Sequence, residues 1–393
     1  MRNLLALAFA VAVAVAVTVT THGLSPHVAH DARPVPALAA SPAPAAQAGP
    51  WVVPRAPDGK PDLQGNWTNE TQTPLERMGT TSATLTKEQA AAIEERARLV
   101  AEFRDQASDP DRPAPPKGGD NQVLTAPGEP SFIERIAESA GGQVGGYNGF
   151  WLEPGDRVIT IDGVARSSII IDPPDGRIPA LTPEGKKRLS TYAARAKQFG
   201  EFDHPEARPL ADRCLISFGS NLGPPMLPNY FYNNNYQIVQ TRDHVMIMTE
   251  MVHDVRVVRL GENVQRLPAH VRPWFGDSIG RWEGDTLVVE TTNLHPEQLA
   301  QVSILWPYRG ASENLKVTER FTRTGPDTLF YRFTMEDPST FTAPFSGELP
   351  FNRIDGLIHE YACHEGNYAL ANILSGERAK EKREAEQKKQ PQQ

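Results

Sequence analysis

The chain has 393 residues, a net charge of −8 from 40 basic and 48 acidic residues, and only two cysteines. This acidic balance, with no basic block outside the C-terminal tail, argues against nucleic acid as a partner. Two cysteines are too few for a cysteine-rich zinc site, and no P-loop, dinucleotide-binding or haem-attachment motif is present. We therefore expect no metal and no cofactor.

Residues 1–22 are typical of an export signal, because one Arg precedes an apolar run from Leu4 to about Val19. An uncleaved membrane anchor is the alternative, since the run is close to the shortest membrane-spanning length. Residues 23–50 are rich in Pro and Ala and predict a linker. We expect a periplasmic or secreted protein that has no membrane contact beyond its export signal, with the cleavage point left open.

The remainder predicts a single β-rich domain over 51–375, followed by a charged tail over 376–393. Its first part, 51–210, carries helix and hairpin signals, and its second part, 211–366, carries the main run of strands. Three helices are expected.

The first predicted helix covers 85–106, where Thr86 and Gln89 have the spacing of a capping box. The second covers 181–198, with Thr182 as the N-cap and a proline at the first helical position. The third begins at residue 367.

Two β-branched runs around Asp162-Gly163 predict a hairpin within 157–172. From Tyr236 onward, short strand-like runs follow one another, most of them separated by turn residues. These predicted strands cover 236–241, 244–251, 254–260, 280–284, 285–293, 314–323, 327–336, 345–351 and 357–363.

Short strands joined by tight turns favour antiparallel pairing. In 315–323 the residues Leu315, Val317, Glu319 and Phe321 alternate with polar ones. The expected fold class is mainly β (α+β), an antiparallel meander that forms a barrel or a sandwich with a few peripheral helices.

The blocks "PDGKPDLQGNWTN" and "YACHEGNY", with others between them, resemble those of a group of secreted bacterial proteins whose activity is not characterised. The resemblance covers most of the chain. A weaker resemblance, carried by Gly65-Asn66-Trp67, is to the lipocalin-like (calycin) barrels. It implies a Trp that plugs one barrel end under an Arg from a late strand. About 170 residues separate Trp67 from the main meander, which departs from the lipocalin pattern.

The segment "EYACHEGNY" places Cys363, His364 and Glu365 side by side. A secreted chain with one cysteine pair usually oxidises it, so we expect a Cys214–Cys363 disulfide in preference to a nucleophilic Cys363. The neighbouring "HEYACHE" is not a zincin motif, because its two His are five residues apart and a zincin helix needs four.

Acid–base chemistry is the next possibility, with His364, Glu365, His253 and Asp254 as candidate catalytic residues. Adjacent residues on a strand face opposite ways, so the useful pairs are His253 with Glu365 or His364 with Asp254. The structural alternative makes His253 and Asp254 plain turn residues, His364 a wall residue, and Glu365 part of a helix cap.

A Pro-, Asn- and aromatic-rich stretch at 221–241 contains a long loop, 223–236, that leads into the first strand of the meander. Such loops often line binding sites, although a purely structural role is equally open. A disulfide from Cys214 would bring this loop beside "CHEGNY". The candidate ligand-binding residues are Arg213, Asn233, Asn235, Tyr236 and Trp282.

Three functions follow as hypotheses. The first is an exported protein that binds a small organic ligand in a barrel or cleft. The second is a cofactor-free hydrolase, or a lyase or hydratase, on the same scaffold. The third is a structural or interaction protein of the envelope. The sequence leaves ligand identity and oligomeric state open.

Overall fold

The computed structural model describes residues 51–104, 153–196, 198, 200, 202–301 and 307–389. The predicted signal peptide (1–22) and linker (23–50) lie outside these residues. Trp51–Gln393 form one compact unit.

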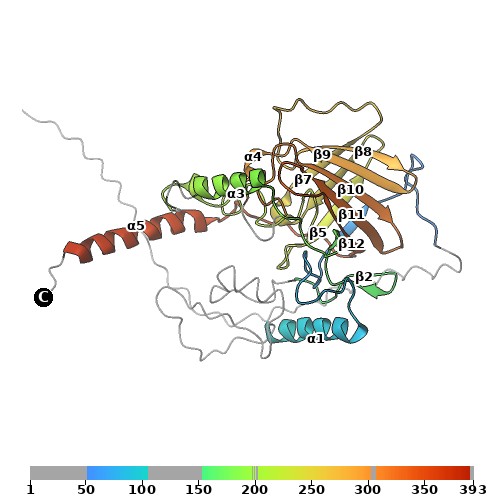
Figure 1. Cartoon of the computed structure of the whole chain (residues 1–393), viewed down its shortest axis with the longest axis horizontal. Helices are drawn as coiled ribbons and strands as arrows, with labels where there is room; N and C mark the ends of the chain where they lie inside the picture. The colour runs from blue at the N-terminus through green and yellow to red at the C-terminus, as the bar shows by residue number, and fades with distance from the viewer. Residues whose placement is uncertain are drawn as a thin grey trace, which may run out of the picture. The chain divides into compact units, whose positions relative to one another are not determined.

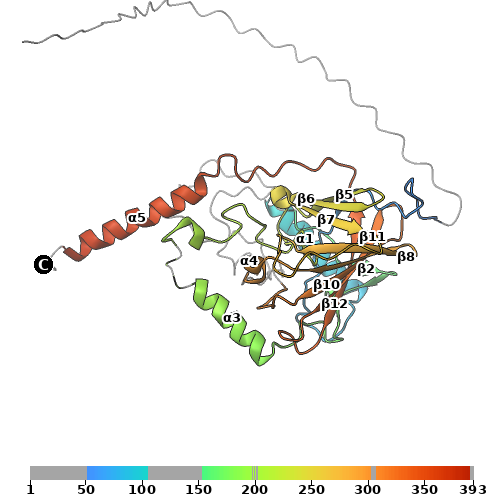
Figure 2. The same ribbon diagram turned by 90° about the horizontal axis from the view of Figure 1, so that it is seen from above.

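Nine strands form a closed barrel, so the choice between barrel and sandwich is settled as a barrel (Figures 1 and 2). The order is β1-β5-β6-β7-β8-β9-β10-β11-β12, and β1 pairs with β12 as well as with β5. The strands are β1 (Gly65–Thr68), β5 (Asn235–Gln240), β6 (His244–Thr249), β7 (Val255–Leu260), β8 (Asp277–Glu283), β9 (Thr286–Thr292), β10 (Lys316–Arg323), β11 (Thr328–Glu336) and β12 (Phe345–Arg353).

The prediction of a purely antiparallel meander is wrong at one place, because β7 and β8 pair in parallel. Every other pair in the barrel is antiparallel. A parallel neighbour needs a long connection that returns the chain to the same end of the sheet. Residues 261–276 supply this connection between the two strands.

The predicted hairpin forms from β2 (Thr160–Ile161) and β3 (Val164–Ala165). Asp162 has φ 52° and Gly163 has φ 76°, as a tight turn between two strands requires. The chain then reaches β4 (Ile170–Asp172), which pairs with β12 next to the barrel.

The helices are α1 (Lys87–Arg104), α3 (Pro183–Ala196), α4 (Pro296–Leu299) and α5 (Tyr368–Lys389), with short 3-10 turns η2 (Pro205–Ala207) and η3 (Met251–His253). The capping box of α1 is present, since the Gln89 backbone donates to Thr86 Oγ1 at 3.2 Å and the Thr86 backbone donates to Gln89 Oε1 at 2.9 Å. Thr182 caps α3 through the backbone of Gly185. Within the described residues, no helix combines the length and the apolar character that a membrane span needs.

The strand predicted at 357–363 is wrong, because this segment has no regular secondary structure. The chain leaves β12 at Arg353, where β12 already pairs with β1, while β11 pairs along the other side and β4 with Ser346 and Gly347. Because the β1–β12 pairing closes the barrel, the segment has no edge strand of the barrel to join. It passes Asn66 and Glu250, which hydrogen-bond its backbone at Gly356 and His359, and leads into α5. Helix α5 continues through most of the predicted tail and is exposed along nearly all of its length.

The barrel interior is packed by the alternate residues that the strand pattern selects. Trp67, for which the lipocalin resemblance implies a place at one barrel end, has no exposed surface. Its indole donates to the Leu63 carbonyl at 3.1 Å. The guanidinium carbons of Arg323 and Arg353 lie 5.6 and 6.0 Å from the centre of its ring. Trp67 therefore closes one end of the barrel under two arginines from late strands.

The register defines two ends of the barrel. The Trp67 end carries the hairpin turns after Gln240, Glu283 and Arg323. The opposite end, here called the loop end, carries the connections after Thr68 and Thr249 and the long segment before β5. The candidate site lies at the loop end.

Candidate functional site

Buried tyrosines hold the 220–227 loop over the loop end of the barrel. Tyr236 donates to the backbone carbonyl of Asn221 at 2.7 Å, and Tyr308 donates to that of Pro224 at 2.8 Å. Both side chains have no exposed surface. The loop is itself buried, so its backbone groups depend on these hydroxyls for their hydrogen bonds.

A buried ion pair lies beneath this loop, between β7 and β10. Arg256 and Glu319 are 2% and 0% exposed, and two parallel hydrogen bonds join the guanidinium to the carboxylate. Tyr331 donates to Glu319 Oε1 at 2.8 Å and accepts from the backbone N–H of Met226 at the same distance. The ion pair is thereby connected to the loop through one tyrosine.

Four of the five buried side-chain polar atoms that have no hydrogen-bond partner among the described residues lie around this network. They are Asn69 Oδ1, Asn221 Nδ2, Thr249 Oγ1 and Arg256 Nε. Tyr236 links several of them, because its hydroxyl accepts from Asn69 Nδ2 at 3.1 Å, and Tyr236 on β5 lies directly opposite Thr249 on β6. We call Tyr236 and the four residues that carry these atoms the interior polar cluster.

The pairing of β6 with β7 places Arg256 in the same cluster. Arg256 on β7 lies directly opposite Ile247 on β6, and Ile247 and Thr249 are two residues apart on the same inward face of β6. Its charge also acts on Tyr236, whose pKa is raised by burial and is lowered somewhat by Asn69 and by Arg256. The cluster therefore contains donors and acceptors that are linked through Tyr236 and the strand register and are shielded from water.

Burial and charge fix the protonation of this interior. Burial disfavours the Arg256 charge, but Glu319 more than offsets it, so the pKa of Arg256 lies above its usual value. Burial raises the pKa of Tyr331 well above its usual value, and the nearby Glu319 charge raises it further. The pKa of Tyr308 is raised by burial in the same way. This network thus holds one paired cation, one paired anion and neutral phenols.

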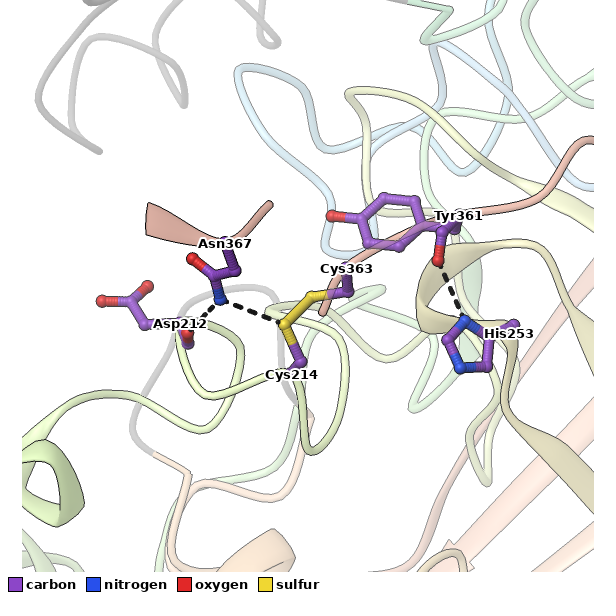
Figure 3. Close-up of a disulfide and its surroundings, with 6 residues drawn as sticks. All are labelled: Asp212, Cys214, His253, Tyr361, Cys363 and Asn367. Atoms are coloured by element: carbon purple, nitrogen blue, oxygen red, sulfur yellow. Dashed lines mark hydrogen bonds between the residues drawn. A yellow bond between two sulfur atoms is a disulfide. The ribbon is translucent and has the colours of Figure 1, made fainter. Parts of the chain in front are cut away.

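The structure confirms the expected cysteine pair (Figure 3). Cys214 and Cys363 are disulfide-bonded, with their Cα atoms 5.8 Å apart. The amide of Asn367 donates to Cys214 Sγ at 3.4 Å and to the Asp212 carbonyl at 3.3 Å. The "CHEGNY" turn is therefore fixed beside residues 212–214, and the half-buried Arg213 lies on that side.

His364 and Glu365, the central catalytic candidates, lie on an exposed turn just before α5. Within the described part of the chain, no side-chain hydrogen bond or ion pair holds either of them. Glu365 thus has no capping bond to α5 there. A catalytic role for His364 stays a prediction that the geometry does not support, since no titratable side chain among the described residues orients its ring.

His253 is the last residue of η3 and Asp254 follows it at the loop end, as expected for turn residues. The His253 ring, through Nδ1, is 2.9 Å from the Tyr361 carbonyl, and the backbone of His253 is left-handed with φ 46° (Figure 3). The pKa of Asp254 is raised to about 7 by burial, which the His253 charge opposes. Among the described residues, neither expected pair, His253 with Glu365 or His364 with Asp254, is joined by a hydrogen bond.

The candidate ligand-binding residues divide between the two ends. Asn233 and Asn235 lie at the loop end, where Asn233 is left-handed with φ 54° and Asn235 donates to Glu250 Oε2 at 2.8 Å. Tyr236 is in the interior polar cluster. Trp282 is near the end of β8, at the Trp67 end, and packs against the hydrophobic core. Trp282 therefore does not share a site with the others.

Sequence reasoning missed Asn69, Asn221, Thr249, Arg256 and Glu319 as site residues. The sequence did carry a signal for the charged pair. Glu319 occupies a position of β10 that alternation assigns to the apolar face, and Arg256 lies on the same face of β7 as the buried Val258. A charged residue on the inward face of a strand requires a buried partner. No sequence pattern shows which strand supplies that partner.

No group of three or more His, Cys, Asp or Glu residues that could hold a metal ion occurs within the described ranges. Comparison with protein-family models and with curated proteins finds no match to the chain. The resemblances to a group of secreted proteins and to lipocalin-like barrels stay predictions.

Proposed function

We propose that the chain binds a small organic molecule inside the barrel, beneath the 220–227 loop. The interior polar cluster carries this proposal, since its residues bring together buried polar atoms that no described residue satisfies. Leaving one such atom without a partner costs about 1–3 kcal/mol. Several of them in one place favour a function that provides a partner from outside the chain.

The aromatic wall beside the cluster supports the same function. The rings of Tyr236 and Phe351 are 5.3 Å apart, and those of Tyr331 and Phe351 are 5.2 Å apart. Binding sites for small organic molecules combine such apolar and aromatic walls with a few fixed polar groups. Here the walls are rigid because each ring belongs to a barrel strand.

The protein is also proposed to work outside the cytoplasm. The disulfide-bonded pair Cys214 and Cys363 favours an oxidising compartment, and the apolar run at the N-terminus favours export. Cell fractionation that recovers the chain in the cytoplasm with both thiols free would contradict this part of the proposal.

The test of binding uses the full chain purified from the compartment in which it accumulates. After extensive washing, it is denatured and the released small molecules are identified by mass spectrometry. Tyr236→Phe removes the hydroxyl at the centre of the cluster, and the matched control Tyr230→Phe removes another buried hydroxyl, which donates to the Thr73 carbonyl.

Tyr230→Phe should lose about 1 kcal/mol of stability with its hydrogen bond to Thr73, and Tyr236→Phe about 2 kcal/mol, because its hydroxyl makes two hydrogen bonds. Only Tyr236→Phe should also lose the bound molecule. An extract with no small molecule, together with no change in melting temperature across a metabolite panel, would refute the binding function.

Acid–base catalysis is a second candidate, favoured by one observation. Asp254 has a pKa of about 7 beside His253, so its carboxyl can exchange a proton near neutral pH. Turnover on a screened set of esters, lactones and unsaturated acids that disappears in Asp254→Asn and in His253→Ala would support it. Turnover that also requires His364 would restore the catalytic set that the sequence predicts.

A further inference from the structure

The directions of the hydrogen bonds determine what the interior polar cluster offers to a ligand. Asn69 Nδ2 donates to the Met226 carbonyl at 3.4 Å, and a carbonyl can only accept, so Asn69 Oδ1 is the free acceptor. Arg256 Nε can only donate. Thr249 Oγ1 can do either. A bound molecule must therefore bring an acceptor for Arg256 and a donor for Asn69.

The charge of the interior limits the ligand further. Arg256 is paired with Glu319 through two hydrogen bonds, and the tyrosines there are neutral. The acidic side chains Glu70 and Glu250, near this end of the barrel, do not supply a cation. A buried anion would have no cation of the interior polar cluster left to pair with, which makes its transfer from water unfavourable. An ammonium group carries no acceptor for Arg256 Nε.

We propose that the ligand is an uncharged molecule that carries a carbonyl or hydroxyl oxygen next to an N–H or O–H group, as primary amides, hydroxy ketones and neutral sugars do. This inference rests on the proposed binding function. The oxygen accepts from Arg256 Nε, the N–H or O–H donates to Asn69 Oδ1, and Thr249 Oγ1 completes the contact. Carboxylates and amines of the same shape are rejected.

The experiment measures binding of isosteric pairs to the full chain at pH 7.5. The probes are acetamide, isobutyramide and benzamide, each compared with its carboxylate: acetate, isobutyrate and benzoate. Binding is followed by melting temperature and by the NMR signal of the Arg256 Nε–H group, assigned by its loss in Arg256→Lys. We expect at least one amide to bind about tenfold or more tightly than its carboxylate and to shift the Arg256 signal.

Thr249→Val tests whether the site itself makes the selection. Because Thr249 Oγ1 has no partner among the described residues, its removal should raise the melting temperature by about 2 °C while it weakens amide binding about tenfold. Thr291→Val is the control, since Thr291 is equally buried but bonds Ser278 at 2.8 Å. It should lower the melting temperature and leave amide binding unchanged.

The outcomes separate this inference from the function on which it rests. A carboxylate or an amine recovered in stoichiometric amount from the purified chain, or one that binds better than its amide, overturns the inference and leaves the binding function standing. No recovered molecule and no binding of any probe, with ordered water alone in the cluster, overturns both. Equal binding by Thr249→Val and the unchanged protein moves the site elsewhere and also overturns the inference.

Discussion

Arg256 and Glu319 are worth little to stability as an intact pair, because burying two charges offsets most of their attraction. Their importance appears when one partner is removed. Glu319 also accepts from Tyr331, which in turn bonds the 220–227 loop through Met226. A change at Glu319 therefore affects a cation, a phenol and the loop together.

We expect Glu319→Gln to lower the free energy of unfolding by about 3–5 kcal/mol, because it leaves the Arg256 charge buried without a counterion. The double variant Arg256→Met with Glu319→Leu removes both charges and should recover most of this loss. Urea denaturation of the three proteins measures the difference. A loss below about 1 kcal/mol for Glu319→Gln would show that water reaches the pair.

A second residue prediction concerns pH. The pKa of Glu70 is raised to about 7, first by burial and then by Glu153 and Asp156, from an ordinary value of 4.5. Between these values the folded chain holds the proton more tightly than the unfolded chain does. The stability that Glu70 contributes is therefore fully present below pH 4.5 and is lost as the pH rises towards 7.

Asp254 acts in the same sense, since its pKa is raised from 3.8 to about 7. The melting temperature should fall between pH 5 and pH 8, and Glu70→Gln should reduce the fall because its side chain does not ionise. Melting curves at half-unit pH steps measure this. A melting temperature that rises over this range in the unchanged protein would contradict the assignment of both carboxyls.

At the scale of single elements, β1 shows what local pattern can and cannot predict. Gly65-Asn66-Trp67 indicates a strand with a buried Trp, and this is confirmed. Its place between β5 and β12 follows only from closure of the whole barrel. The strands from β5 to β12 could be predicted because alternation is local. The segment 357–363 looks like a strand and is not one, because the closed barrel has no edge strand for it to join.

The same limit applies to the site. Alternation indicated that Glu319 faces the core, but its partner is on β7, some sixty residues earlier. The parallel pairing of β7 and β8 depends on the course of the 261–276 connection, which has no local signal. His364 and Glu365 drew attention by composition alone, and their exposure depends on where the chain leaves the barrel.

Trp67→Ala should cost about 3–5 kcal/mol, because it empties the Trp67 end of the barrel. It also removes the ring under Arg323 and Arg353, and thereby weakens the closure by β1. Trp282→Ala is the matched control, since Trp282 also packs against the core but is only partly buried. Thermal melts that give equal losses for the two variants would show that Trp67 has no special part in the closure.

At the scale of the whole molecule, the disulfide and the barrel closure are separate constraints. The Cys214–Cys363 bond joins residues that are 149 positions apart in the sequence, and β5 to β12 all lie between them. Strand β1 lies outside that loop, yet it joins the first and last of those strands. Cutting the disulfide therefore leaves every strand pair of the barrel intact.

The double variant Cys214→Ser with Cys363→Ser should accordingly keep the barrel and lose about 2–5 kcal/mol, chiefly because its unfolded chain gains freedom. Asn367→Ala separates this effect from the local contact, since it removes the bonds to Cys214 and Asp212 but keeps the disulfide. It should cost about 1 kcal/mol. The measurement is denaturant unfolding with circular dichroism of the native state. If the double variant loses the barrel signal in buffer alone, the disulfide is required for closure and β1 does not suffice to hold the strands.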